Sequence, residues 1–285
     1  MVLGAAGQLG RELVRVLPPA ETVPLTHADL DVRDAGAVAT RLAALRPDVV
    51  VNTVADNRVD QAEADPTESH AINAVAVGTI ARACRTHDAF LVQLSTDYVF
   101  DGHAGRPYTE DDPPAPLGAY ARAKLEGERL ARALAPRHAI VRVAGLYARG
   151  GSRGKGGSFV DRVQQRARAG EPLRIVADQV TAPTWARDVA TTLATLVPRW
   201  VAGSAPVGIY HLTNAGACSW YDFARAVLRG AGLVADVRPI TSAELAAAAP
   251  RPAYSVLADT RLPALGLEPL RSWDAALAAY LADDA

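Results

Sequence analysis

The chain has 285 residues, enough for one large domain or two modest ones, and its 49% hydrophobic and 21% charged content is that of an ordinary globular protein. A formal net charge of −1 argues against nucleic acids and membrane surfaces as partners, because both select a strong basic excess. No apolar run reaches the roughly 18–20 residues that cross a bilayer, and the opening residues lack a signal-peptide pattern. Two cysteines cannot build a disulfide framework, so we expect buried free thiols in a cytoplasmic protein.

Short apolar runs alternate with helical patterns through the first half of the chain. Strands are predicted at 23–25, 49–53, 90–94 and 140–143, and helices at 8–17, 35–45, 66–85 and 119–134. This alternation is typical of βαβ units, in which helices cover both faces of a parallel sheet. Two of the strands, at 49–53 and 90–94, begin with three consecutive apolar residues, as strands buried on both faces should.

The periodicity loosens after Ala144, where a basic, glycine-rich loop runs from Arg149 to Gly157. Helices are predicted beyond it at 159–169, 185–197 and 219–230, and short strands at 173–176 and 209–212. We therefore predict an α/β fold of the Rossmann type, a doubly wound parallel sheet in residues 1–148, with a smaller mixed α/β C-terminal substrate domain in residues 149–285. The two later strands could join the sheet of the first domain.

Three glycines open the first helix at the spacing G-x-x-G-x-x-G. Glycines let the backbone approach a pyrophosphate closely, and a helix N-terminus adds free N–H groups and a partial positive charge. Alone, such a loop also fits a plain turn between strand and helix. In its βαβ context we interpret the segment Gly4-Ala5-Ala6-Gly7-Gln8-Leu9-Gly10 as a dinucleotide-binding loop.

The end of the second strand bears on the choice between NADPH and NADH. NAD-selective sites usually carry an acidic residue there, whereas Val23–His27 contains no carboxylate. Arg11, directly after the last glycine, could bind a 2′-phosphate, although it could also be a solvated helix residue. We therefore favour NADPH, with NADH as the other option. Asp31 and Val32 could lie beside the adenine, or Asp31 could only cap a turn.

Tyr120 and Lys124 are four residues apart in the predicted helix 119–134, so both side chains project from one face, about 6 Å apart along the axis. Lys124 is one of only two lysines, with Lys155, in a chain that otherwise uses arginine. A nearby ammonium favours the phenolate, which eases proton transfer from the tyrosine at neutral pH. We predict carbonyl reduction, in which carbon receives hydride from the cofactor, oxygen receives a proton from Tyr120, and Thr96 holds the carbonyl in line.

Longer strings of residues surround these positions. The most specific are Ser95-Thr96-Asp97-Tyr98-Val99-Phe100-Asp101-Gly102 and Asp178-Gln179-Val180-Thr181-Ala182-Pro183-Thr184, and further strings lie at 7–10, 46–52, 59–63, 116–120 and 251–252. With them the chain resembles, nearly end to end, the dTDP-4-dehydrorhamnose reductase family of the extended short-chain dehydrogenase/reductase superfamily.

The resemblance implies NADPH-dependent reduction of the C4 ketone of a dTDP-4-dehydro-6-deoxyhexose, most simply dTDP-4-dehydro-L-rhamnose to dTDP-L-rhamnose. It implies that Thr96, Tyr120 and Lys124 are catalytic, and that Tyr120 and Lys124 also contact the cofactor. The remaining cofactor contacts would come from the glycine loop, Arg11, Asp31, Val32, Val54, Ala55 and Asp56. The substrate contacts would come from Thr96, Asp97, Gln179, Thr184 and Arg187. A homodimer is compatible with the sequence, and the six scattered histidines predict no metal site.

Departures from the family pattern leave the sugar open. The family often has an aromatic residue or histidine where Asp56 stands, and a tryptophan that would contact the sugar where Gly145 stands. Another deoxysugar 4-ketoreductase, a nucleotide-sugar epimerase or dehydratase, and a non-catalytic nucleotide-binding regulatory subunit are alternatives. Asp97 keeps the dehydratase option open, because such enzymes commonly place an acidic residue beside the threonine. Arg187 could instead pair with Asp188 or Asp178. The basic loop, with Arg149, Arg153 and Lys155, could close over the diphosphate or stay solvated.

Overall fold

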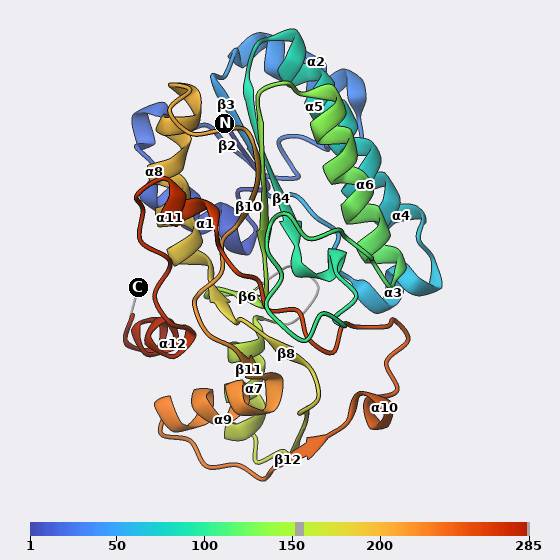
Figure 1. Cartoon of the computed structure of the whole chain (residues 1–285), viewed down its shortest axis with the longest axis vertical. Coiled ribbons are helices and arrows are strands. Elements are labelled where there is room, and N and C mark those ends of the chain that lie inside the picture. Colours follow the sequence, from blue (N-terminus) through green and yellow to red (C-terminus); the bar gives the residue numbers. More distant parts are fainter. Residues whose placement is uncertain (152–156, 284–285) are drawn as a thin grey trace.

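The computed structural model describes residues 1–151 and 157–283 and is built around a six-stranded parallel sheet (Figure 1). The strand order is β10-β5-β4-β3-β1-β2. The strands are β1 (Val2–Leu3), β2 (Pro24–Leu25), β3 (Val49–Asn52), β4 (Phe90–Thr96), β5 (His138–Val143) and β10 (Gly208–His211). The sheet grows outward from β1 in both directions, so the topological switch point lies between β1 and β3, where this class of fold binds its ligands. The predicted α/β fold is confirmed.

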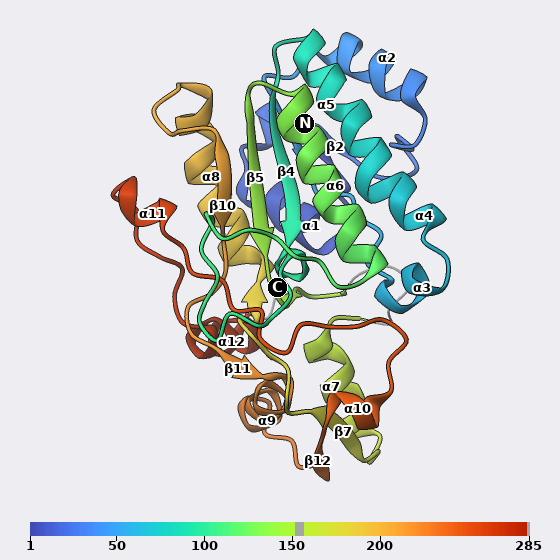
Figure 2. The same ribbon diagram turned by 45° about the vertical axis from the view of Figure 1, so that its right-hand side comes forward.

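Helices cover both faces of the sheet (Figures 1 and 2). One face carries α1 (Gln8–Val16) and α8 (Ala186–Val201). Their apolar residues form one hydrophobic cluster with Phe90 and Val92 of β4. The other face carries α2 (Ala35–Leu45), α5 (Ala76–Thr86) and α6 (Ala119–Leu134). All seven residues of β4 are buried, as the continuous apolar start of this strand predicts.

The predicted helix 66–85 is divided into α4 (Thr67–His70), a π-helical turn (η2, Ala71–Val75) and α5. The short helix α3 (Val59–Ala64) precedes it. At the π-helical turn, α6 packs directly on the backbone, because a Cβ atom at Gly127 would collide with the carbonyl oxygen of Asn73. This close approach sets the position of α6 against the rest of the fold.

A smaller unit lies beyond the C-terminal ends of the strands (Figure 2). It contains α7 (Phe159–Arg168), α9 (Trp220–Gly230), α12 (Trp273–Ala282) and a two-stranded parallel sheet of β7 (Leu173–Val176) and β12 (Val237–Ile240). Its aromatic core includes Tyr147, Phe223 and Tyr280. The remaining short elements are β6 (Leu146–Tyr147), β8 (Val180–Thr181), β9 (Thr184–Trp185), β11 (Cys218–Ser219), α10 (Ser242–Leu245), α11 (Arg261–Ala264) and the 3₁₀ turns Pro19–Glu21 and Asp97–Val99.

Two later strands, at 173–176 and 209–212, were predicted as possible additions to the central sheet, and one of them joins it. Strand β10 pairs with β5 and so joins the central sheet, and α8 packs against α1 on its face. Strand β7 does not join that sheet, because it pairs with β12. The chain therefore crosses between the two units more than once.

Both cysteines, Cys84 and Cys218, are free and buried. Within residues 1–151 and 157–283, no helix is long and apolar enough to cross a membrane.

Candidate active site

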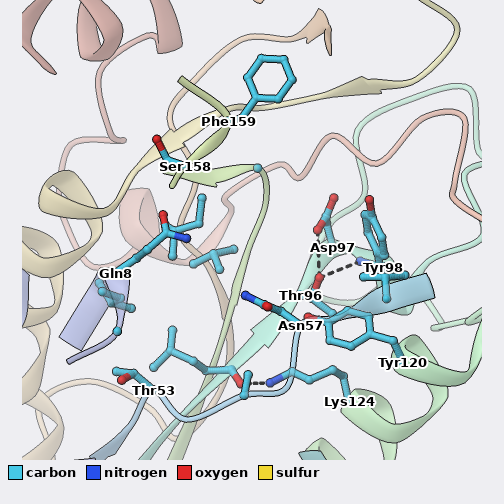
Figure 3. Close-up of a pocket in the computed structure, with 18 of the residues that line it drawn as sticks. Gln8, Thr53, Asn57, Thr96, Asp97, Tyr98, Tyr120, Lys124, Ser158 and Phe159 are labelled. Atoms are coloured by element: carbon cyan, nitrogen blue, oxygen red, sulfur yellow. Dashed lines mark hydrogen bonds between the residues drawn. The ribbon is translucent and has the colours of Figure 1, made fainter. Parts of the chain in front are cut away.

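A cavity of about 780 Å³ lies between the C-terminal ends of the sheet strands and the smaller unit. The sheet side contributes the glycine loop and the residues that follow β1 to β5. The opposite side is formed by residues 157–181 of the smaller unit together with Trp220 and Leu245. Figure 3 shows Gln8 on one side of this cavity, Thr96, Tyr120 and Lys124 across from it, and Ser158 and Phe159 at its far end.

The glycine loop has the shape that a pyrophosphate requires. Gly4 has φ +78°, and a Cβ atom there would lie 2.7 Å from Thr53 Oγ1. A Cβ atom at Gly10 would collide with the carbonyl oxygen of Gly4, so the turn closes tightly on α1. Gly7 is the N-cap of α1 and no side chain caps the helix, which leaves its first N–H groups for a ligand. Gly4, Gly7, Gln8 and Leu9 line the cavity, and the buried Gln8 Oε1 has no partner among the described residues.

Two of the predicted cofactor residues are placed elsewhere. Arg11 donates to the carbonyl oxygens of Ala6 (2.6 Å), Arg149 (2.6 Å) and Gly151 (2.9 Å), so its guanidinium ties a loop to α1 and does not line the cavity. Asp31 is paired with Arg33 at 2.6 Å and is also outside the lining. Val32 does line it, with Leu25, Thr26, His27 and Leu30 from the end of β2 and the turn beyond.

The segment after β3 also contains both residues that line the cavity and a residue that does not. Val54 and Ala55 line the cavity, as does Asn57. Asp56 is buried beside them but faces away, because its carboxylate pairs with Arg58 at 2.7 Å and its main-chain N–H donates to Asn73 Oδ1 at 3.1 Å. The predicted contact between Asp56 and the cofactor is therefore corrected to a structural role that holds this segment in place.

The predicted catalytic residues come together on one wall (Figure 3). Thr96 Oγ1 donates to Asp97 Oδ1 at 3.0 Å and accepts from the main-chain N–H of Tyr98 at 3.2 Å. The rings of Tyr98 and Tyr120 meet edge to face, with centroids 6.1 Å apart. Lys124 Nζ donates to the main-chain oxygen of Leu94 at 2.7 Å, which leaves two of its protons for a ligand.

Burial controls the protonation of this wall. It raises the pKa of the Tyr120 phenol above its usual range, and a hydrogen bond with Thr96 only partly offsets this. Burial thus acts against the shift toward phenolate that a nearby ammonium favours, and it favours the form of Tyr120 that can donate a proton. Burial lowers the pKa of Lys124 to about 8, against the opposing charge of Glu128. Burial also raises the pKa of Asp97 to about 6, against hydrogen bonds with Ser255 and Thr96.

Only some of the predicted substrate residues reach the cavity. Thr96, Asp97 and Gln179 line it, and Gln179 Nε2 is held by Ser242 Oγ at 2.9 Å. Thr184 is buried outside it and donates to the carbonyl oxygen of Ala182.

Arg187 is also away from the cavity. It pairs with Glu12 at 2.8 Å and Asp283 at 3.0 Å. Neither the predicted binding role nor the alternative pairing with Asp188 or Asp178 matches this placement. Arg149 donates to the carbonyl oxygens of Tyr280 and Asp283, whereas Arg153 and Lys155 lie outside the described residues.

Several residues of the lining were not predicted. Trp220 is the first residue of α9, directly after the N-cap Ser219. It packs against the aromatic core of the smaller unit and also lines the cavity, where its ring meets that of Phe159 with centroids 4.7 Å apart. The other unpredicted residues of the lining include Tyr98, Arg162, Arg174, Arg251 and Ser255.

Gly145 also lines the cavity, where the family pattern has tryptophan. Its φ is +52°, a left-handed conformation that side chains rarely adopt, and a Cβ atom would lie 3.0 Å from Pro183 Cα. This backbone conformation therefore disfavours any side chain at position 145, and Gly145 contributes only main-chain atoms to the cavity wall.

Comparisons with known proteins identify the family of the chain. The model of the RmlD substrate binding domain family matches residues 1–285. A dTDP-4-dehydrorhamnose reductase of Streptomyces griseus is 44% identical over 281 residues, which cover 97% of this chain and 91% of that protein. A probable dTDP-4,6-dihydroxy-2-methyloxan-3-one 4-ketoreductase of Streptomyces antibioticus is also 44% identical, over 97% of this chain and 92% of that protein.

The fold has a solved relative of the same kind. The crystal structure of the dTDP-4-dehydrorhamnose reductase of Bacillus anthracis in complex with NADP superposes with a TM-score of 0.92 at 32% identity, covering 99% of this chain and 97% of that one. These matches span nearly the whole chain. The chain therefore belongs to the dTDP-4-dehydrorhamnose reductase family, as the resemblance of its sequence strings predicts.

Proposed function

We propose that this chain reduces the C4 ketone of a dTDP-4-dehydro-6-deoxyhexose with NADPH, most simply converting dTDP-4-dehydro-L-rhamnose to dTDP-L-rhamnose. As a member of its family it is an NAD(P)H-dependent oxidoreductase. The observation that carries the proposal is the meeting of Thr96, Tyr120 and Lys124 on one wall of a cavity that the glycine loop also lines.

The residues of the wall have distinct roles. NADPH, when held by the glycine loop and by Val32, Val54 and Ala55, supplies the hydride that goes to the carbonyl carbon. Tyr120 donates the proton to the carbonyl oxygen, and its raised pKa keeps that proton in place until the reaction. Thr96 orients the oxygen, and Lys124 holds the cofactor ribose with its free donors. A positioned acid of this kind contributes about 10²–10⁴-fold to the rate.

The far end of the cavity suits the nucleotide part of the substrate. Phe159 and Trp220 offer apolar ring surface for a base, and Arg162 and Arg174 bring positive charge for a diphosphate. We assign the dTDP group to these four residues together with Gln179. They replace Thr184 and Arg187 in the substrate site.

The identity of the sugar is the open part of the proposal. A second candidate is another 4-ketosugar, which the bare wall at Gly145 and the similarity to the Streptomyces antibioticus protein favour. An epimerase or dehydratase would recycle its cofactor, so net NADPH consumption distinguishes the reductase from both. A regulatory subunit would bind NADPH without oxidising it. A cytoplasmic location and a homodimer stay predictions.

The test is an NADPH-oxidation assay on a panel of dTDP-4-ketosugars, with product configuration determined by NMR. Tyr120→Phe should lower kcat at least about a hundredfold with little change in NADPH binding. The matched control is Tyr221→Phe, on α9 and outside the cavity lining, which should turn over like the native chain. Near-normal turnover by Tyr120→Phe would overturn the acid role, and no NADPH oxidation with any sugar of the panel would overturn the function.

A further inference from the structure

One face of α6 contacts three consecutive residues of β4. Tyr120, Lys124 and Glu128 follow one another at intervals of four residues, so they lie in a row on the helix. Tyr120 lies beside Thr96, and Lys124 Nζ donates to the main-chain oxygen of Leu94. The third member, Glu128, accepts from Ser95 Oγ at 2.5 Å. The first two contacts form the catalytic wall, and the third lies directly behind it.

Glu128 is the centre of a buried ion pair. Its Oε1 also accepts from Arg142 Nε at 2.9 Å, and its Oε2 accepts from Arg142 Nη2 at 2.7 Å. The side chains are 3% and 1% exposed. A pair buried this deeply gains little net stability, because desolvating two charges offsets their attraction. Its position one turn beyond the catalytic lysine therefore calls for a role besides stability.

Charged and titratable groups surround this pair on several elements. On β10, His211 Nε2 lies 3.4 Å from Arg142 Nη1, and Glu110 accepts from the main-chain N–H of His211. Burial lowers the pKa of His211 to about 4, so it adds no charge at neutral pH. The charged and titratable groups that act on Tyr120 are Asp97 and Tyr98, which line the cavity, and Asp56, which does not. Glu128 is the carboxylate whose charge opposes the effect of burial on Lys124.

We propose that Glu128 is a positioning residue for the reduction. It fixes where α6 lies along β4, and it supplies the negative charge that keeps Lys124 an ammonium. The proposal rests on the reductase function for its kinetic consequences, but the charge of Lys124 can be measured without turnover. Arg142 and Ser95 hold the Glu128 carboxylate in place, and so connect β5 and β4 to the helix that carries Tyr120 and Lys124.

The two lysines of the chain make a direct test possible. With lysine labelled with ¹³C at Cε, NMR titration should give two resonances, and Lys155→Arg identifies that of Lys124. We expect Lys124 of the native chain to titrate near pH 8. The double variant Glu128→Gln with Arg142→Met removes the carboxylate together with its arginine partner. We expect the titration of Lys124 to fall by about one pH unit in it, because Glu128, and not Arg142, is the charge that acts on Lys124.

Kinetics supply the second readout. The alkaline decline of kcat/KM should move to lower pH by the same amount in the double variant. Glu128→Asp keeps the charge but shortens the reach to Ser95, so it should lower kcat several-fold and leave the pH of the decline unchanged. The matched control is Asp188→Asn on α8, which removes another largely buried carboxylate, paired with Arg271, and should not move the Lys124 titration.

The outcomes separate the two ideas. Unchanged Lys124 titration in a folded double variant overturns the charge role, and unchanged kcat in Glu128→Asp overturns the positioning role. If the double variant does not fold, Ser95→Ala tests positioning without stranding a charge, and wild-type kcat there also counts against it. If the native chain reduces no ketosugar while the titration shifts as expected, the proposed function fails and the charge role stands.

Discussion

The ammonium of Lys124 donates to the main-chain oxygen of Leu94 at 2.7 Å, two residues before Thr96. This bond and the one between Ser95 and Glu128 join the helix that carries the proton donor to the strand that carries the threonine. Lys124 is also buried, and its withdrawal from water is what brings the loss of its charge close to neutral pH.

The first prediction concerns alkaline pH. Because burial lowers the pKa of Lys124 to about 8, the ammonium is lost as the pH rises through that value, well below the range of a free lysine. We expect kcat/KM to decline above about pH 8. Stability should change in the opposite direction, since between pH 8 and 10.5 the unfolded chain binds the proton that the folded chain has released. A pH profile of NADPH oxidation checks this, and a rate constant flat to pH 9.5 would contradict it.

The second prediction concerns Asp97, whose burial raises its pKa from 3.8 to about 6. Above pH 6 the folded state holds a buried carboxylate at a cost, and below 3.8 both states are protonated and the cost disappears. Asp97→Asn should therefore raise the free energy of unfolding at pH 8 by up to about 3 kcal/mol. The gain should vanish near pH 3.5, while kcat falls because the substrate loses a charged contact. Urea unfolding at the two pH values measures it, and an equal gain at both would contradict the assignment to charge.

Local patterns predicted the wall because its determinants lie close together in the sequence. The expected helix 119–134 is α6 residue for residue, and four-residue spacing alone places Tyr120 and Lys124 on one face. The strand before it was expected to end at 94, because Ser95 and Thr96 are polar, yet β4 continues to Thr96. Pairing with Arg142 and Val143 of β5 extends the strand to Thr96, and Glu128 gives the buried Ser95 hydroxyl a partner 33 residues away.

Long-range pairing accounts for what the sequence could not predict. Arg187 is satisfied by Glu12, 175 residues earlier, and Arg11 by carbonyl groups about 140 residues later. No pattern in the neighbouring residues signals such partners. An arginine near a motif is therefore predicted to bind a ligand although its guanidinium is already hydrogen-bonded within the protein. The partner of strand β7 could not be predicted either, because the four residues Leu173-Arg174-Ile175-Val176 do not reveal whether the strand pairs with the central sheet or with β12.

The third prediction concerns cofactor preference. Since Arg11 is occupied by three carbonyl oxygens, Arg11→Met should change the ratio of KM values for NADPH and NADH less than about twofold, and its main effect should be a lower melting temperature. His27 lines the cavity just beyond β2, where NAD-selective sites carry an acidic residue. His27→Asp should therefore lower the preference for NADPH about tenfold, because its carboxylate would repel a 2′-phosphate. Steady-state kinetics with both cofactors measure the two ratios. A large loss of NADPH preference in Arg11→Met would show that the arginine leaves its loop to bind the phosphate.

The fourth prediction uses two glycines in helices. A methyl group at Gly10 would collide with the carbonyl oxygen of Gly4, so Gly10→Ala must open the turn that forms the pyrophosphate loop. Such overpacking costs about 1–3 kcal/mol of stability, and NADPH affinity should fall with it. Gly36, in the first turn of α2, is the matched control, because the nearest atom to a Cβ there is Asp34 Oδ1 at an ordinary 3.4 Å. Gly36→Ala should stabilise the chain by about 0.5–1 kcal/mol through its better helix propensity and leave NADPH affinity unchanged. Thermal unfolding with and without NADPH separates the two variants. If Gly10→Ala binds NADPH as tightly as the native chain, the loop does not cradle the pyrophosphate.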